Sequence, residues 1–411
     1  MHIPLRAALF AVALSSTATV RAQTASLTLE QAVRRAIEAS PRNAAARARG
    51  EVLTAARAQA ETRPAASVDI LAENFGVGGA ELNRQIQIGA TYNQRIERGA
   101  KRDARIALTE GDRGVAAAEA TVSLLDLAQR VQRLFVEVEA TTMAVTLAEE
   151  QLGIARQLQR EVQRRVDGAR DPLFAGTRAR TQLAEAEVDL EIAEHARDAA
   201  MIRLTAMWNG VPAGLRVAAD DFLKFEDAVA VSPSPADLPI YAARRRRADA
   251  AIALERSNAR TDPTLSGGPR FIGTGDFAIV AGVSLPLRNR ALNAANIARA
   301  QAEQRQIDAD LAVERFDRER AIALAAEIVE ESRHEAEAVR DRVIPGLVRT
   351  LAEVRAGYAR GGFSFLDVST AQTALATGRR RLIDAARRHH EAGVELDRLT
   401  GRYLSLVQEA R

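Results

Sequence analysis

The most informative stretch of this sequence is residues 277–287, which read FAIVAGVSLPL. Every second side chain in it is apolar, so Phe277, Ile279, Val283 and Leu285 would share one face of an extended strand. The stretch is as long as the roughly 9–11 residues that a tilted membrane-spanning strand needs. We therefore predict a strand at 277–287 with one lipid-facing side.

A second stretch, residues 85–94, has the same alternation and places Ile86, Ile88 and Tyr92 on one face. Each of these strands has a weaker partner before it in the sequence. Four strands cannot close a membrane barrel, because about eight is the smallest number, and open strand edges are not tolerated in lipid. If the strands cross a membrane, several chains must share one barrel, and three chains would give about twelve strands. Taken alone, the strands also fit two half-buried hairpins of a soluble domain.

The chain is duplicated internally. A seven-residue rhythm of Leu and small residues around Leu183 recurs 192 positions later around Leu375, and the strands match at a spacing of 191. Both halves have the same predicted order of two strands, a long helix, a tight turn and a second helix. We predict a first repeat at 23–209, a linker at 210–235 and a second repeat at 236–411. The predicted strands are 67–75, 85–94, 264–272 and 277–287, and the predicted helices are 98–163, 172–209, 292–356 and 364–400.

The long segments have the composition of helices that pack as antiparallel coiled coils. Residues 98–163 contain no proline, and at 1.5 Å per residue a helix of this size is about 100 Å long. Pro345 falls inside the counterpart helix, where we expect it to produce a kink. The fold class predicted is therefore mainly α with a small β part.

Each pair of long helices is joined by a tight turn that would form an exposed tip. We expect Gly168 and Gly361 to adopt the left-handed backbone that such a turn needs. Asp171, before Pro172, and Ser364 are expected to cap the helices that follow. A tip at the end of a rod is a natural docking surface, although both turns could also be plain connections.

Composition excludes several classes of protein. Charged residues are nearly balanced, with a net charge of +3, which argues against nucleic acid as the main partner. There is no cysteine, so no disulfide and no lipid anchor on a cysteine are expected. Residues 1–22 combine Arg6, an apolar run and small residues before position 23, which predicts a cleaved secretory signal.

No catalytic motif is present in the sequence. We find no phosphate-binding loop, dinucleotide loop or catalytic triad, so we expect no enzyme activity and no cofactor. His389 and His390 are adjacent, and adjacent side chains on a helix point about 100° apart. A solvated helix face is therefore favoured over a metal site at this pair.

Four motifs carry a resemblance to a known family. Residues 27–32, LTLEQA, look like the opening helix of the TolC-type outer-membrane efflux proteins. Residues 94–102, QRIERGAKR, and 284–290, SLPLRNR, are similar to the two strand-to-helix junctions of the cation-efflux (CzcC-like) branch. Residues 361–367, GGFSFLD, match the hairpin pattern of the second tip. Their order and spacing cover nearly the whole mature chain.

The resemblance implies a homotrimer with a twelve-stranded barrel in the outer membrane and a long α-helical tunnel in the periplasm. A girdle around the tunnel would come from residues 27–39, 210–236 and the last residues. The implied partners are a periplasmic adaptor (membrane fusion) protein and an inner-membrane RND-type pump. The chain would be a passive exit duct for heavy-metal cations. Alternatives are multidrug efflux, type I protein secretion or, in another class, a soluble periplasmic coiled-coil scaffold or adaptor.

The resemblance also implies roles for the tips, which close the tunnel and meet the adaptor in this family. Tyr358 and Asp367 fall on gate positions. Phe363 stands where some members carry Arg and Thr370 where some carry a second Asp, so we expect closure to depend on packing of Phe363 and Phe365. The residues expected to contact the adaptor are Gly168, Asp171, Pro172, Gly361, Gly362 and Ser364.

Overall fold

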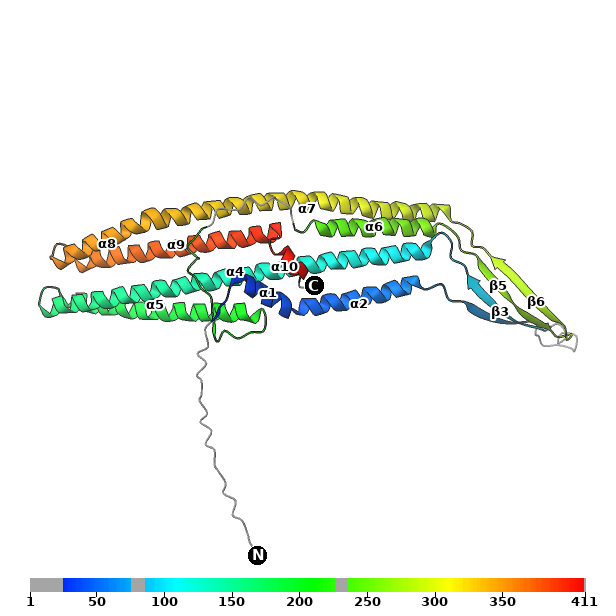
Figure 1. Cartoon of the computed structure of the whole chain (residues 1–411), viewed down its shortest axis with the longest axis horizontal. Helices are drawn as coiled ribbons and strands as arrows, with labels where there is room; N and C mark the ends of the chain where they lie inside the picture. Colours follow the sequence, from blue (N-terminus) through cyan, green and yellow to red (C-terminus); the bar gives the residue numbers. More distant parts are fainter. Residues whose placement is uncertain (1–24, 75–85, 226–235, 410–411) are drawn as a thin grey trace, which may run out of the picture.

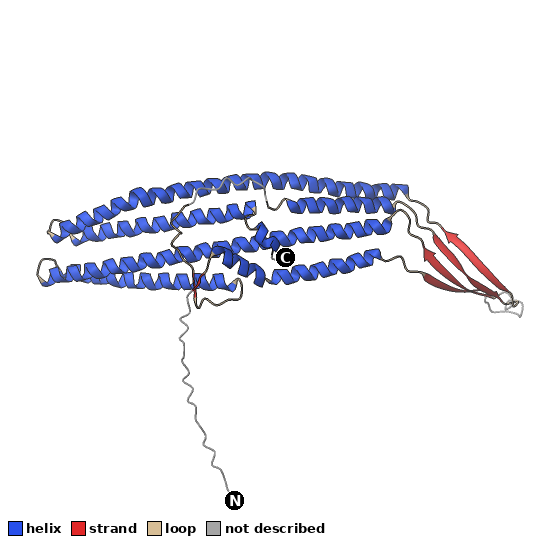
Figure 2. Ribbon diagram, viewed as in Figure 1, coloured by secondary structure: helices blue, strands red, loops and turns tan. Residues whose placement is uncertain are grey.

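The computed structural model describes residues 25–74, 86–225 and 236–409. The predicted signal at 1–22, the last part of the predicted linker and most of the loop between the first two strands lie outside the described residues. Within the described part the chain is mainly helical with one small antiparallel sheet, which confirms the predicted fold class (Figure 2). No helix in these three segments is long and apolar enough to cross a membrane.

The helices lie side by side along the long axis, and the sheet extends from one end of them (Figure 1). The helical elements are α1 (Leu29–Ala39), α2 (Pro41–Glu61), α4 (Lys101–Asp167), α5 (Leu173–Ala206), α6 (Pro239–Asn258), α7 (Arg290–Ala338), the π-helical turn η1 (Val339–Val343), α8 (Ile344–Ala359), α9 (Phe365–Thr400) and α10 (Leu404–Glu409). The strands are β1 (Ala25–Ser26), β2 (Ser67–Glu73), β3 (Gln87–Arg95), β4 (Leu215–Arg216), β5 (Thr264–Ile272) and β6 (Phe277–Ser284).

The two halves have the same order of elements, as the duplication predicts. A hairpin, β2–β3 or β5–β6, precedes a long helix, a turn and a second helix in each half. The long helix of the second half is interrupted by η1, just before Pro345. Proline has no N–H group, and its ring clashes with the carbonyl of the residue four positions earlier, here Asp341. The widened turn accommodates this clash, so the irregularity expected at Pro345 is present.

The main sheet is antiparallel, with the strand order β2-β3-β5-β6. β5 covers the predicted residues, whereas β6 ends at Ser284, earlier than the predicted residue 287. Pro286 explains the early end, because proline cannot donate the hydrogen bond that would extend the ladder. The bounds of β2 and β3 differ from the predicted ones by one or two residues.

The largest apolar cluster lies at mid-length, where short elements wrap the long helices. We define the girdle as α1, residues 210–225 and α10. Its side chains, among them Ile37, Val217 and Val407, pack against α4 and the end of α5. Thr28 and Gln31 form a capping box that fixes the start of α1. The segments expected to form a girdle therefore do meet in space.

The helices form a single row with two open edges. Near the sheet the neighbours run α2, α4, α6, α7, and toward the tips they run α5, α4, α9 and then α7 with α8. One edge consists of β2, α2 and α5, and the other consists of β6, α7 and α8. Because the two edges consist of different elements, they expose different surfaces.

Candidate functional site

The sheet has one apolar and one polar face, because the register aligns the alternation of all four strands. Val68 pairs with Tyr92, Ile88 with Phe271, and Phe271 with Phe277. The apolar face comprises Val68, Ile70, Ala72, Ile88, Ala90, Tyr92, Leu265, Gly267, Pro269, Phe271, Phe277, Ile279, Ala281 and Val283. Ile86 and Leu285 continue this alternation just outside β3 and β6.

The apolar face is open in the isolated chain. Ile279 is 79% exposed, and Ile88, Tyr92, Phe277, Val283 and Leu285 are also exposed. Water-exposed apolar surface of this extent is unfavourable and indicates that another apolar phase covers it. All the strand residues predicted to face lipid lie on or in line with this face, and their contact with lipid remains a prediction.

The opposite face carries polar and charged side chains. Asn93 donates a hydrogen bond to Asp69 over 2.8 Å, and Arg270 donates to Gln87 over 3.3 Å. These residues stand at the positions between the apolar ones. The sheet could therefore separate an apolar environment from an aqueous one.

The turns of the two helical hairpins lie at the other end of the molecule from the sheet (Figure 1). Three side chains tie these hairpins together. The buried Tyr358, near the end of α8, donates its hydroxyl hydrogen to Asp171, in the turn between α4 and α5. Arg165 of α4 donates two hydrogen bonds to the Asp171 carboxylate, over 3.0 and 3.1 Å. It also donates to the Tyr358 carbonyl over 2.9 Å and lies over the Tyr358 ring at 4.3 Å. We call Arg165, Asp171 and Tyr358 the tip cluster.

The charges of the tip cluster stabilise one another. Burial on its own would raise the pKa of Asp171, but hydrogen bonds from Arg165 and Tyr358 outweigh it and lower the pKa below the ordinary value. Burial, and then the hydrogen bond to Asp171, raise the pKa of the Tyr358 hydroxyl. Asp171 therefore stays charged and Tyr358 stays protonated at neutral pH, which is the combination that the hydrogen bond requires.

Two expectations for the first tip are wrong. Asp171 does not cap α5, whose N-cap position is Pro172 and has no side-chain hydrogen bond. Its carboxylate is instead held by charge-assisted hydrogen bonds within the tip cluster, which are stronger than a neutral cap. Gly168 has φ −85°, and the left-handed position is taken by Ala169, with φ +53°.

The second tip agrees more closely with the expectations from the sequence. Gly361 has φ +83°, and Ser364 caps α9 in a reciprocal capping box with Asp367. The backbone N–H of Ser364 donates to Asp367 over 2.8 Å, so the predicted gate residue Asp367 also fixes the start of α9 while remaining exposed. This capping box fixes the first turn of α9, so the connecting turn ends at Ser364.

The two phenylalanines of the second tip have different surroundings. Phe365 is buried beside Tyr358 in an apolar cluster with α4 and α5. Phe363 is half exposed and covers Gly357, where an added Cβ atom would clash with the ring. Phe365 therefore joins the hairpins within one chain, and the roles of both rings in closing a tunnel remain predictions. Pro172 and Gly362 are exposed at the tips, as adaptor contact requires.

No signal in the sequence points to Arg165. It lies among several arginines near the end of α4, and no local pattern distinguishes it from Arg164 beside it. Its partner Tyr358 is 193 residues away in the chain. Only the packing of the two hairpins against each other identifies it.

The histidine pair of α9 is covered by α7 at His389 and by the girdle at His390, so the expected solvated helix face is wrong. A ring nitrogen of His389 lies 3.0 Å from the Val329 carbonyl, and one of His390 lies 2.9 Å from the Phe222 carbonyl. Burial lowers the pKa of both rings. No group of three or more His, Asp or Glu side chains in the described segments could hold a metal ion.

Substitution of Glu139, in α4, tests how much the burial of a carboxyl group at the girdle affects stability. Burial, and then the charge of Asp221, raise its pKa from 4.5 to about 7. A raised pKa stabilises the folded state fully below 4.5, and this contribution is lost as the pH rises through 7. Glu139→Gln, which is neutral throughout, is therefore expected to raise the free energy of unfolding by about 2 kcal/mol at pH 8 and to change it little at pH 4.5. Denaturant unfolding at both pH values measures this.

The matched control is Glu149→Gln, at an exposed position on the same helix. It is expected to leave stability unchanged at both pH values. Equal effects of the two substitutions would show that the burial of Glu139 has no energetic consequence.

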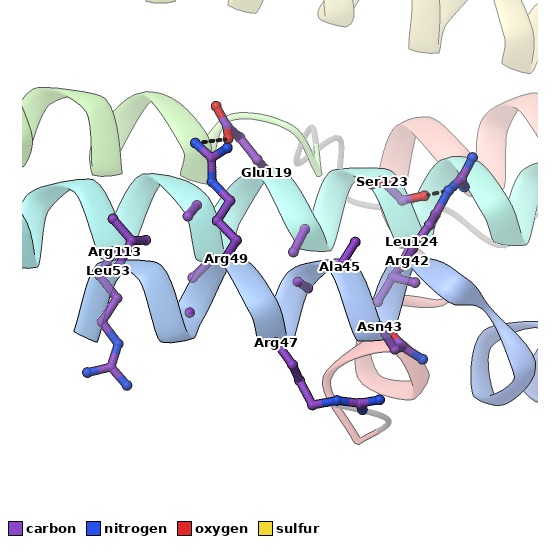
Figure 3. A pocket seen from close by; sticks show the side chains of 15 residues that line it. Arg42, Asn43, Ala45, Arg47, Arg49, Leu53, Arg113, Glu119, Ser123 and Leu124 are labelled. Carbon is purple, nitrogen blue, oxygen red and sulfur yellow. Dashed lines mark hydrogen bonds and ion pairs between the residues drawn. The ribbon is translucent and has the colours of Figure 1, made fainter. Parts of the chain in front are cut away.

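One of several surface pockets is a groove of about 450 Å³ between α2 and α4 (Figure 3). Its floor is mostly alanine, and its rim carries arginines. Arg42 donates to the Ser123 carbonyl over 3.0 Å, and Arg49 lies 3.7 Å from Glu119, whereas Arg47 points away from α4. The groove brings together no acid–base pair or nucleophile that could carry out a reaction.

Comparison with known proteins supports the resemblance seen in the sequence. No protein-family model matches the chain. The cobalt-zinc-cadmium resistance protein CzcC of Cupriavidus metallidurans is 28% identical over 324 residues, which are 76% of this chain and 77% of that protein. Among solved structures, CusC has a TM-score of 0.73 at 15% identity, covering 90% of this chain and 91% of that one. The outer membrane protein VceC of Vibrio cholerae has a TM-score of 0.71 at 16% identity, covering 91% and 96%.

The chain shares its row of long helices joined to a four-stranded sheet, along nearly its whole length, with CusC and VceC. This shared fold and the similarity to CzcC agree with the resemblance of the chain to the TolC-type outer-membrane efflux proteins.

Proposed function

We propose that three copies of this chain form the outer-membrane exit duct of a tripartite efflux system that exports heavy-metal cations. The observation that carries the proposal is the open row, with β2, α2 and α5 along one edge and β6, α7 and α8 along the other. Because the two edges differ, contact between copies is head-to-tail, and such contacts close into a ring when the rotation allows it. The ring would enclose a pore.

Both edges expose apolar side chains that a neighbouring copy could cover. On α2 and α5 these are Val52, Val188, Ile192 and Ile202, and on α7 they are Val313, Phe316, Leu324 and Ile328. Burial of apolar side chains contributes about 25 cal/mol per Å², so closure is favourable in water. Three copies are proposed because three four-stranded sheets give about twelve strands, which exceeds the minimum of about eight for a membrane barrel.

The proposed cargo rests on the similarity to CzcC, a protein named for cobalt, zinc and cadmium resistance. The duct would be passive, because its described side chains supply a path rather than a reaction. Energy would come from an inner-membrane RND-type pump, connected through a periplasmic adaptor that meets the tips. Multidrug efflux is the alternative within this class.

The function is tested by deleting the gene and measuring growth in cobalt, zinc and cadmium salts and in a panel of drugs. Metal sensitivity that the wild-type chain restores, with drug tolerance unchanged, is the expected result. Sensitivity to drugs alone would contradict the metal assignment but leave the duct intact. A purified chain that stays monomeric and dissolved without detergent would contradict the duct itself.

The two faces of the sheet provide a sharper test of membrane contact. Ile279→Lys places a charge on the apolar face, where a membrane-facing charge costs about 2–4 kcal/mol near the bilayer centre. Val280→Lys, one position further on, places the same charge on the polar face. We expect Ile279→Lys to reduce the amount of heat-resistant trimer in the outer membrane and Val280→Lys to leave most of it. Equal losses would argue against a lipid-facing apolar face.

A further inference from the structure

Positive charge is concentrated where the sheet joins the helices. The four connections between strands and long helices are residues 62–66, 95–102, 259–263 and 284–290, and they hold eight Arg and Lys residues against two acidic ones. These junctions thus carry +6, while the whole chain carries only +3. The remainder of the chain therefore has a net negative charge, so the junctions are not simply part of a basic surface.

Both acids at the junctions are already engaged. Asp262 is buried and pairs with Lys101 over 2.7 Å and with Arg95 over 3.3 Å. Glu97 pairs with Arg105 of α4. Asp262 compensates only one of the two charges of Lys101 and Arg95, and no acid at the junctions is left over for the remaining arginines.

Six arginines at the junctions have no side-chain hydrogen bond or ion pair within the described segments. All six are exposed, and every one of the four junctions contributes at least one. We call them the junction collar: Arg63, Arg98, Arg102, Arg260, Arg288 and Arg290.

The apolar face of the sheet leads directly into this collar. Ile96 continues the alternation of β3 and is 41% exposed, two residues before Arg98. Leu285 and Leu287 continue the alternation of β6 and are 55% and 95% exposed, immediately before Arg288. An apolar row that ends in exposed arginines matches the boundary between the acyl chains and the headgroups of a lipid leaflet.

Closure of a ring would increase the local charge. β2 and β6 are the edge strands, so Arg288 and Arg290 of one copy would come near Arg63 of the next. Like charges at such a boundary repel one another unless an anion lies between them. The chain itself supplies no free carboxylate at these junctions.

We infer that the junction collar binds the phosphate groups of anionic phospholipids in the leaflet next to the helices. Guanidinium groups bind phosphate through two parallel hydrogen bonds, and near an anionic surface each additional arginine strengthens the attraction. The inference rests on the proposed membrane position of the apolar face. The collar fixes the depth of the sheet in the bilayer, at the end from which the helices emerge.

The test measures lipid binding to the purified, detergent-solubilised protein by native mass spectrometry. The probes are phosphatidylglycerol, which is anionic, and phosphatidylcholine, which carries phosphate but no net charge. We expect the wild-type protein to retain phosphatidylglycerol preferentially. The triple variant Arg98→Gln, Arg288→Gln, Arg290→Gln is expected to lose at least about tenfold in affinity for this lipid. Its Arg→Lys counterpart, which keeps the charge, is expected to retain most of the binding.

The matched control removes three exposed arginines elsewhere, in the variant Arg130→Gln, Arg160→Gln, Arg349→Gln, and is expected to bind phosphatidylglycerol like the wild type. Equal loss in both triple variants would overturn the collar, because net charge alone would then explain binding. Equal retention of the two lipids by a wild-type protein that inserts into bilayers would also overturn it, without affecting the proposed duct. Failure of the wild type to insert would instead contradict the duct.

Discussion

In the proposed duct, replacing Asp171 with asparagine is expected to open the end formed by the helical tips. The substitution removes the charge that Arg165 binds through two hydrogen bonds and weakens the acceptor of the Tyr358 hydroxyl. A hydrogen bond to a charged group contributes about 1.5–3 kcal/mol, so the balance between closed and open tips should shift at least about tenfold for each chain. Single-channel conductance in planar bilayers measures this shift.

Tyr358→Phe separates the two parts of this effect. It removes only the hydroxyl that donates to Asp171 and keeps the ring beneath Arg165, so we expect a smaller increase in conductance. The control is Asp167→Asn, which changes an exposed acid in the same tip whose hydrogen bond is to Gln163 of its own helix. Conductance should stay at the wild-type level in that variant. If Asp171→Asn also conducts like the wild type, the tip cluster does not hold the two hairpins together.

Arg398→Met is expected to cause a large loss of stability. Arg398 is buried and donates two hydrogen bonds to the buried Asp237, over 2.9 and 3.2 Å, and one to Asp126 over 2.7 Å. Removing one partner of a buried ion pair costs about 3–5 kcal/mol, because the other charge is left without full compensation. Among the residues that the structure describes, Asp237 would keep only Arg318 as an ion-pair partner, at 3.1 Å.

The loss is measured as a fall in the temperature at which the proposed oligomer dissociates. Arg402→Met is the matched control, since Arg402 is 68% exposed and pairs over 3.2 Å with the partly buried Asp397, so that water screens the pair from one side. We expect it to leave the dissociation temperature nearly unchanged. Similar falls in both variants would mean that burial of the Arg398–Asp237 pair does not matter.

Much of the fold could be predicted because its signals are local. The alternation at 277–287 and 85–94 identified the strands and the side chains that share a face. The seven-residue rhythm identified the long helices, and Ser364 identified the start of α9. Each of these patterns acts over a few residues, where backbone geometry alone fixes which side chains are neighbours.

The same local reasoning failed where distant segments meet. Asp171 has the position of a helix cap, yet Tyr358, 187 residues later, and Arg165 bind its carboxylate. His389 looks like part of a solvated helix face, yet α7 covers it. In both cases a buried contact with a residue far away in the sequence outweighs a local preference of about 1 kcal/mol. No neighbouring residue in the sequence indicates that contact.

The sequence by itself determined the order of strands and helices, the duplication and the apolar side of the sheet, since these depend on periodicity within each segment. The tertiary structure alone decided which charges are buried together. Arg398 and Asp126 are 272 residues apart, and only the packing of α9 on α4 makes them partners. Charge pairing depends on distances of a few ångströms between chain segments, which periodicity along one segment does not encode.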